Sequence, residues 1–210
     1  MLIKICGITN LEDALLAVDA GAGALGFNFW RPSRRFIEPA DARVLIDQLP
    51  ANVLTVGVFV NAESPEIVKQ VAVQAGVTAL QLHGDESPEY CEALVDHYVI
   101  KALGTGDDFE PRRVLKYHVR AIMLDAFDDK NRGGTGRRIN WAMARRTREL
   151  VPRLFLAGGL SPENIAEAIA EVHPYAVDAC SALESAPGKK DAERVRSFIK
   201  AALAAESSNK

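Results

Sequence analysis

Cysteine is scarce in this chain. Only three occur among 210 residues, Cys6, Cys91 and Cys180. An odd and sparse set argues against a disulfide framework, and it is typical of proteins that work in a reducing cytosol. We therefore expect free thiols and a cytoplasmic location.

A long apolar segment is also lacking. The chain enters a strand-like run directly at Met1, with no charged leader and no small-residue cleavage site, so we expect no signal peptide. No uncharged stretch is long enough to cross a bilayer. We expect no membrane partner.

The chain carries no strong charge of either sign, with a net charge of −3 and a pI near 5.9. This charge balance does not indicate nucleic-acid binding. Basic residues cluster within 31–35 and 137–148, but other residues interrupt both clusters, which is typical of a solvated surface. Spacings such as CxxC or HExxH are absent, so we predict no metal site.

Short apolar runs alternate with amphipathic segments along the whole chain. Several runs are apolar without strict alternation, as expected of parallel strands covered on both faces. The predicted strands are Leu2–Cys6, Ala24–Phe29, Val53–Val60, Thr78–Leu82, Tyr98–Leu103, Ala121–Asp125, Leu154–Ala157 and Ala176–Ala179.

Helix-start signals stand between these runs. They combine an N-cap residue with acidic residues or proline in the first turn, and glycine follows two of the helices. The signals are Asn10 with Glu12 and Asp13, Ser64-Pro65-Glu66, Ser87-Pro88-Glu89 and Ser161-Pro162-Glu163, with Gly21 and Gly76 as stops. We expect the last helix to run roughly from Asp191 to Ala204.

Eight strand-then-helix units predict an α/β fold, a single (β/α)8 TIM barrel over residues 1–205 with a polar tail at 206–210. A doubly wound open sheet is the alternative, but the chain has no segment for a second domain. One long, polar, glycine-rich loop, residues 127–136, follows the sixth strand and is typical of a lid or binding loop.

Active sites of such barrels lie at the carboxyl ends of the strands. Reactive side chains gather at these ends more than packing alone requires. The residues there are Cys6, Asn28, Arg34, Arg35, Asn61, His83, Gly84, Asp85, Lys101, Asp125, Gly158, Gly159, Asp178, Cys180 and Ser181.

Two of these residues suit proton transfer. The thiolate of Cys6 is a capable base, although most free cysteines are small buried hydrophobes. Asp125 ends an apolar strand, where an unpaired carboxylate is costly, so it is either functional or caps the following loop. Cys6 with His83 is a possible nucleophile–base pair, but the phosphate-binding features below do not call for a hydrolase.

Other strand ends suit anions. Gly158 and Gly159 lie between a strand and a helix N-terminus in the seventh unit, and Asp178 and Ser181 lie in the eighth, the usual phosphate cradle of this fold. Glycines at such positions can also be required only because a larger side chain would clash at the helix entry. An arginine guanidinium can bind a carboxylate through two parallel hydrogen bonds, and Arg35 or its neighbour Arg34 could do so. His83 fits best as a polar residue that holds a loop.

Taken in order, the motifs resemble the phosphoribosylanthranilate isomerase family. The resemblance covers residue 2 to about 195, and the ordered set is specific although each motif alone is weak. The motifs are Lys4-Ile5-Cys6-Gly7-Ile8-Thr9, Gly26-Phe27-Asn28-Phe29, Ser33-Arg34-Arg35-Phe36-Ile37, Val56-Gly57-Val58-Phe59, Gln81-Leu82-His83-Gly84-Asp85-Glu86, Leu124-Asp125, Gly133-Gly134-Thr135-Gly136, Leu156-Ala157-Gly158-Gly159-Leu160, Asp178 with Ser181, and Gly188-Lys189-Lys190-Asp191.

The resemblance implies an Amadori rearrangement in tryptophan biosynthesis, from N-(5-phosphoribosyl)anthranilate to 1-(2-carboxyphenylamino)-1-deoxyribulose 5-phosphate. It implies no cofactor, a small phosphosugar substrate, and a monomer or homodimer. Cys6 would be the general base and Asp125 the general acid, while Arg35 would bind the anthranilate carboxylate. The remaining substrate-binding residues would be His83, Gly158, Gly159, Asp178, Ser181 and Ala182.

These roles set electrostatic requirements. Asp125 must be protonated in the productive complex, whereas Cys6 needs a lowered pKa, for which Lys4 and Arg35 are the candidate cations. The chain departs from the family at Ala182, where glycine is usual and a Cβ could restrict the phosphate cradle, and at Cys180, where serine is usual.

Other functions remain possible from the residues. A related histidine-pathway isomerase and indole-glycerol-phosphate synthase share phosphate-binding barrels, which fold-level analogy does not separate. A barrel that binds phosphosugars without turnover is a further alternative, which only the Ala182 departure supports.

Overall fold

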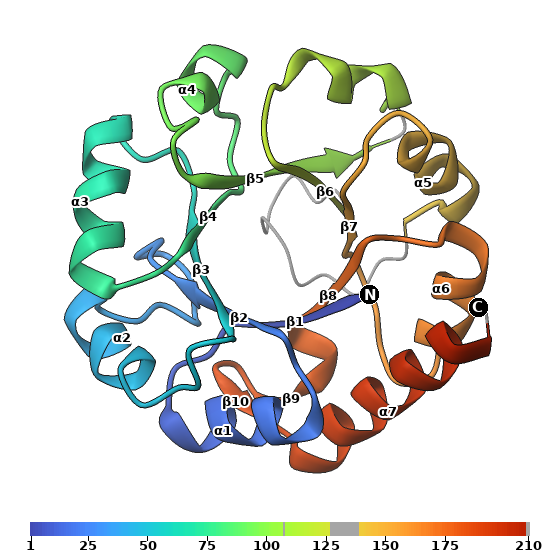
Figure 1. Cartoon of the computed structure of the whole chain (residues 1–210), viewed down its shortest axis with the longest axis horizontal. Helices are drawn as coiled ribbons and strands as arrows, with labels where there is room; N and C mark the ends of the chain where they lie inside the picture. The colour runs from blue at the N-terminus through green and yellow to red at the C-terminus, as the bar shows by residue number, and fades with distance from the viewer. Residues whose placement is uncertain (107, 127–138, 209–210) are drawn as a thin grey trace.

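The computed structural model describes residues 1–106, 108–126 and 139–208. Eight parallel strands form a closed barrel in the order β1 to β8, which confirms the predicted (β/α)8 barrel (Figure 1). The strands are β1 (Leu2–Cys6), β2 (Ala24–Asn28), β3 (Leu54–Phe59), β4 (Ala79–Leu82), β5 (Tyr98–Thr105), β6 (Ala121–Ala126), β7 (Leu154–Leu156) and β8 (Ala176–Ala179). The predicted loop at 127–136 lies outside the described residues.

Helices surround the ring of strands (Figure 1). They are α1 (Leu11–Ala20), α2 (Pro39–Ile46), α3 (Pro65–Ala75), α4 (Pro88–Glu92), α5 (Trp141–Arg148), α6 (Ile165–Val172) and α7 (Ala192–Ser208). The predicted caps of α1, α3 and α4 are confirmed, because Asn10, Ser64 and Ser87 each accept a hydrogen bond from a backbone N–H in the first turn. Gly21 and Gly76 end their helices in the left-handed conformation.

Three helical segments differ from the prediction. After β5 the chain forms a 3₁₀ helix, η1 (Pro111–Lys116), in place of an α-helix. Helix α6 begins at Ile165 rather than at Pro162 after a Ser161 cap, because the Asn164 side chain bonds the Ser161 N–H and the Gly159 carbonyl and holds this segment as a turn. Helix α7 continues to Ser208, past the expected end at Ala204.

The eighth unit carries an extra hairpin before its helix. A short 3₁₀ turn, η2 (Ser181–Leu183), leads into the antiparallel pair β9 (Glu184–Ala186) and β10 (Lys189–Lys190). This hairpin returns the chain to β1, because the Lys190 ammonium donates to the Cys6 carbonyl. The prediction of a simple strand-then-helix unit here was incomplete.

Alternating side chains separate the barrel interior from the layer beneath the helices. Apolar residues such as Val56, Met123 and Phe155 fill the interior, whereas Phe27 and Leu124 pack towards the helices. This period of two sends every second residue of a strand into the barrel. None of the described helices is long and apolar enough to cross a membrane.

Candidate active site

The same period of two builds the candidate active site. Asp125 is two residues beyond the interior residue Met123, and Asp178 is two beyond Ala176. Cys6 follows Lys4, whose register partner on β8 is Asp178. Cys6, Asp125 and Asp178 therefore share the inward face at the carboxyl ends of their strands, where this fold places its catalytic groups.

Cys6 lies in a crowded polar environment between two glycines. A Cβ added at Gly26 would meet the Cys6 sulfur at 2.7 Å and the Lys4 ammonium at 3.1 Å, so both groups border the space that glycine leaves open. A Cβ at Gly7, whose φ is +76°, would meet the Cys180 sulfur at 2.9 Å. Hydrogen bonding from the Cys180 thiol and the charge of Lys4 hold the pKa of Cys6 well below its ordinary value, although burial opposes them.

A buried ion pair lies directly below Cys6. The Lys4 ammonium donates to Asp178 Oδ1 at 2.9 Å, and the Lys4 side chain has no exposed surface. Burial raises the pKa of Asp178 to about 7, and the charges of Cys6 and Asp125 add to this rise while Lys4 opposes it. Asp178 thus interacts with both residues to which we assign proton transfer.

Asp125 is held at the end of β6 by one hydrogen bond and one close contact with a histidine ring. Its Oδ1 accepts from the Ala126 N–H at 2.8 Å, and its Oδ2 lies 3.1 Å from Nε2 of His83. The other ring nitrogen of His83 lies 2.7 Å from the Gln81 amide nitrogen. His83 therefore contacts the candidate acid, which is closer to the chemistry than the loop-holding role that its position suggested.

A small cavity of about 50 Å³ opens beside Asp125 at the ends of β7 and β8. Gly158 and Gly159 both have positive φ, and a Cβ at Gly158 would lie 2.5 Å from the Ala126 nitrogen, so this close approach requires glycine. Ala182 belongs to η2 and its φ is not positive, so its Cβ causes no backbone strain. The cavity is lined by Asp125, Ala157, Gly158, Gly159, Leu160, Asp178, Ala179, Cys180, Ser181 and Ala182.

The structure distinguishes the two arginines. Arg34 is exposed, whereas Arg35 turns inward and forms a two-pronged ion pair with Glu184, with Nε to Oε1 at 2.8 Å and Nη2 to Oε2 at 2.7 Å. Glu184 also accepts from the Lys190 ammonium at 3.1 Å. Arg35, Glu184 and Lys190 thus form one charged network beside Cys6.

Comparison with known proteins agrees with this geometry. The family model described as N-(5'phosphoribosyl)anthranilate (PRA) isomerase matches residues 3–201. The chain belongs to the phosphoribosylanthranilate isomerase family. It is 50% identical to the N-(5'-phosphoribosyl)anthranilate isomerase of Pelobacter propionicus over 200 residues, which cover 95% of this chain and 94% of the relative.

Solved structures give the same result. The phosphoribosyl anthranilate isomerase of Thermotoga maritima has a TM-score of 0.91 and 43% identity, and the match covers 97% of this chain and 100% of that one. Another phosphoribosyl anthranilate isomerase structure, with a TM-score of 0.86, 44% identity and coverage of 97% and 100%, is described as a complex with reduced 1-(o-carboxyphenylamino)-1-deoxyribulose 5-phosphate.

Lys101 and Asn28 are two of the strand-end residues that do not belong to the candidate site. Lys101 is buried and donates to Glu86 at 2.7 Å and to the Gly84 carbonyl at 2.7 Å, so it supports the loop that carries His83. Asn28 accepts from the Trp30 N–H and shapes the loop after β2. Within the described residues, no group of three or more histidine, cysteine or acidic side chains could hold a metal ion.

Sequence reasoning missed the contributions of Glu184 and Lys190. Lys190 belongs to a motif that carried the family resemblance, but a lone charge after the last strand is ordinarily solvated surface. The side chains of Glu184 and Lys190 are 4% and 0% exposed. No local signal marks them, because their partners Arg35 and Cys6 are near the other end of the chain.

Proposed function

We propose that this chain catalyses the Amadori rearrangement of N-(5-phosphoribosyl)anthranilate to 1-(2-carboxyphenylamino)-1-deoxyribulose 5-phosphate, a step of tryptophan biosynthesis. Membership of the family supports this, and so does the product-like ligand named for one relative. The observation that carries the proposal is the shared inward face of Cys6 and Asp125, with Asp178 interacting with both.

The two ends of the substrate have matching sites. We assign the phosphate to the loop of Gly158 and Gly159 and to the turn at Ser181 and Ala182, where backbone N–H groups can approach an anion closely. We assign the anthranilate carboxylate to Arg35. Glu184 takes Nε and Nη2 of this guanidinium, so Nη1 is the donor that we assign to the substrate carboxylate. Two anchored ends hold the ribose between Cys6 and Asp125.

Asp125 starts the reaction as general acid. It gives a proton to the furanose oxygen, the bond from this oxygen to C1′ breaks, and a protonated imine forms between C1′ and the anthranilate nitrogen. The contact with His83 orients the carboxyl group of Asp125. Phosphate and carboxylate of the substrate add negative charge nearby, which favours the protonated acid.

Cys6 completes the reaction as general base. Its thiolate removes the proton from C2′, the electron pair moves towards the imine nitrogen, and an enolamine results. The enol oxygen then loses its proton while C1′ gains one, which yields the ketone, and exchange with solvent restores the acid and the base. The imine is the electron sink, so this route needs no cofactor.

Turnover of the purified chain tests the proposal. Loss of the substrate's fluorescence should proceed without added cofactor. Because each general acid–base step typically contributes about 10²–10⁴-fold, Cys6→Ala, Cys6→Ser and Asp125→Asn should each lower kcat by at least about 10²-fold. Full activity in both kinds of variant, with folding confirmed by circular dichroism, would remove Cys6 and Asp125 from their roles.

A substrate panel separates the alternatives. Turnover of a histidine-pathway phosphosugar or of the indole-glycerol-phosphate precursor in place of phosphoribosylanthranilate would favour those barrel enzymes. Binding of the product analogue without turnover would favour a non-catalytic barrel.

We also propose that the chain acts in the cytoplasm as one domain over residues 1–205, as a monomer or homodimer, and without nucleic acid or membrane partners. Three free thiols support the location. The Thermotoga maritima relative is described both as dimeric and as generated monomers, so sedimentation at several concentrations is the direct measurement for this chain.

A further inference from the structure

The contacts identify which cation faces Cys6. Lys4 and Arg35 are the two candidates from the sequence. The guanidinium of Arg35 is committed to Glu184 through two hydrogen bonds of 2.8 Å and 2.7 Å. A cation whose charge is matched by its own carboxylate has less effect on a third group. Lys4 is also paired, with Asp178 at 2.9 Å, but an ammonium has three donors, and its nitrogen borders the same space at Gly26 as the Cys6 sulfur. Lys4 is therefore the stronger candidate.

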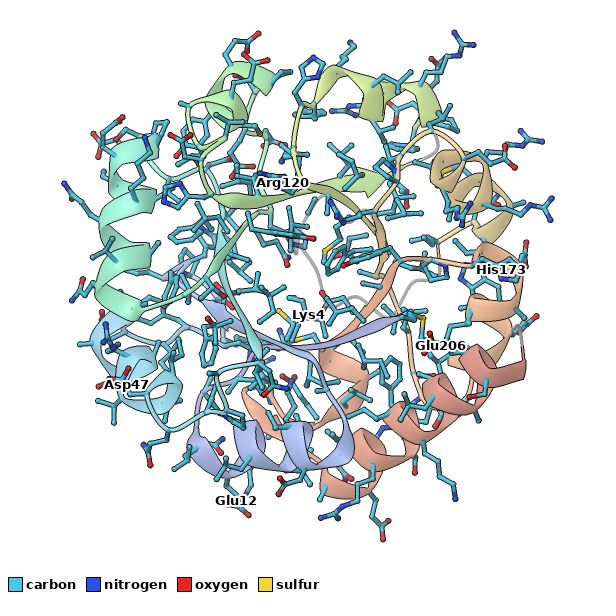
Figure 2. The ribbon with its side chains drawn as sticks, in the orientation of Figure 1. Lys4, Glu12, Asp47, Arg120, His173 and Glu206 are labelled. Carbon is cyan, nitrogen blue, oxygen red and sulfur yellow. The ribbon has the colours of Figure 1, made fainter. Side chains whose placement is uncertain are left out.

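Lys4 lies inside the ring of strands, unlike labelled residues such as Glu12 and Asp47 on the outer helices (Figure 2). Its side chain is fully buried, and a buried ammonium requires anionic or hydrogen-bonding partners. Asp178 is one partner at 2.9 Å. Cys6 is the other, since the Lys4 ammonium and the Cys6 sulfur border the same space at Gly26. Both partners raise the pKa of Lys4 against the effect of burial.

The two neighbouring thiols have different charged neighbours. The Cys180 sulfur lies 3.9 Å from Oε1 of Glu184. The Lys190 ammonium lies 4.0 Å from that sulfur, but it also contacts Glu184 at 3.1 Å and the Cys6 carbonyl. A negative charge on Cys180 would thus lie beside a carboxylate as well as beside cations that this carboxylate already pairs, whereas one on Cys6 borders the Lys4 ammonium. The hydrogen bond from the Cys180 thiol and the Lys4 ammonium both favour the Cys6 thiolate, and of the two only the ammonium carries a full charge.

We propose that Lys4 is a positioning residue that keeps Cys6, rather than Cys180, in the thiolate form, and that Asp178 competes with this thiolate for the Lys4 charge. The proposal rests on the proposed function only for the use of the thiolate as base. The charged and titratable groups that face Cys6 are Lys4 of β1, Arg35 after β2, Asp178 of β8, Cys180, Glu184 of β9 and Lys190 of β10.

Competition for the Lys4 charge predicts in which direction each substitution changes the stability of the Cys6 thiolate. A purely structural ion pair would be broken equally by removing either partner, so Lys4→Met and Asp178→Asn would change the thiol in the same direction. If Lys4 stabilises the thiolate, Lys4→Met must disfavour it. Asp178→Asn removes the competing anion and must leave the thiolate equally or more favoured.

The experiment measures the rate at which iodoacetamide modifies Cys6 as a function of pH, by mass spectrometry of the Cys6 peptide. In the unaltered protein we expect the midpoint of this pH dependence to lie below about 8.5, the ordinary pKa of a cysteine thiol. Lys4→Met should raise the midpoint by about one unit or more, so that modification at a pH below both midpoints slows by about tenfold or more. Asp178→Asn should leave the midpoint unchanged or lower it. Lys200→Met, at an exposed position of α7, is the matched control and should behave as the unaltered protein.

Two results would overturn the proposal: an ordinary midpoint in the unaltered protein, or an upward shift of equal size in both single variants. Lys4→Met leaves Asp178 buried without its partner and could impair folding. A comparison of the single variant Asp178→Asn with the double variant Lys4→Met/Asp178→Asn avoids this, because neither leaves a buried carboxylate unpaired. The double variant should show a higher midpoint than Asp178→Asn alone. Modification rates do not depend on turnover. If Cys6→Ser stays fully active, the base assignment fails, while the role of Lys4 towards the thiolate is judged by the midpoints alone.

Discussion

Nε2 of His83 lies 3.1 Å from Oδ2 of Asp125, and Nδ1 of the same ring lies 2.7 Å from the amide nitrogen of Gln81. An amide NH₂ group only donates, so Nδ1 accepts from Gln81. The other ring nitrogen, Nε2, lies beside the carboxyl group to which we assign general acid catalysis. The imidazole thus links a buried amide of β4 to the reactive end of β6.

His83→Ala should lower kcat because Asp125 loses its orienting partner. The loss should be smaller than the roughly 10²–10⁴-fold expected of the acid itself, since Asp125 remains. Steady-state kinetics with phosphoribosylanthranilate gives both kcat and KM. His118→Ala, in the segment before β6, is the control, because this residue lies outside the candidate site. Equal kcat in the two variants would contradict a role for His83 at Asp125.

Gly26→Ala should reduce activity without unfolding the protein. The new Cβ would lie 2.7 Å from the Cys6 sulfur and 3.1 Å from the Lys4 ammonium, so both groups must move. Overpacking of this kind typically costs about 1–3 kcal/mol of the free energy of unfolding. Denaturant titration and kinetics measure the two effects.

Gly23→Ala is the matched control for that change. Its Cβ would meet only the end of the Leu2 side chain, at the opposite end of the barrel. We expect a change in stability with unaltered kcat. If Gly23→Ala and Gly26→Ala lowered kcat equally, crowding at Cys6 would not be the cause.

Glu184→Gln should destabilise the protein most at neutral pH. Arg35 and Lys190 hold the pKa of Glu184 below its ordinary value, although burial acts in the opposite direction. A carboxylate with a lowered folded pKa contributes stability that is present above the unfolded pKa of about 4.3, and this stability is lost as the pH falls through the folded pKa. Removing one partner of a buried pair typically costs about 3 kcal/mol or more.

Urea unfolding at pH 7 and at acidic pH measures this dependence. The difference between the unaltered protein and Glu184→Gln should shrink as the pH falls below the unfolded pKa of about 4.3 and through the lowered folded pKa of Glu184. Glu163→Gln, which removes an exposed ion pair with Arg194, should have little effect at either pH. A difference that grows on acidification would contradict a lowered pKa for Glu184 in the folded protein.

Cys91 should resist alkylation in the folded protein. Burial raises the pKa of this thiol to about 11, and Glu86 adds to the rise. At pH 8 we expect iodoacetamide to modify Cys6 and to spare Cys91, as measured by peptide mass spectrometry. Denaturation should make Cys91 reactive, which is the internal control. Comparable rates at the two cysteines of the folded protein would show that the thiol environments are not those of the structure.

Local interactions along the sequence determined the elements of this protein. An Asn10 or Ser64 cap bonds a backbone N–H within the next turn, and Gly21 ends its helix within one turn. Such rules act over a few residues, so the strands, several helix ends and the barrel topology could be predicted. The turn at residues 161–164 escaped prediction because the Asn164 side chain competed with helix formation.

Tertiary structure decided what surrounds each reactive group. Lys4 meets Asp178 across 174 positions of the chain, and Lys190 meets the Cys6 carbonyl across 184. The inward direction of Arg35, the support that Lys101 gives to the His83 loop and the contact between His83 and Asp125 likewise depend on barrel closure. Motifs indicated which residues matter, but pKa values and partners follow from burial and from charges brought together in space, and neither is a property of nearby sequence.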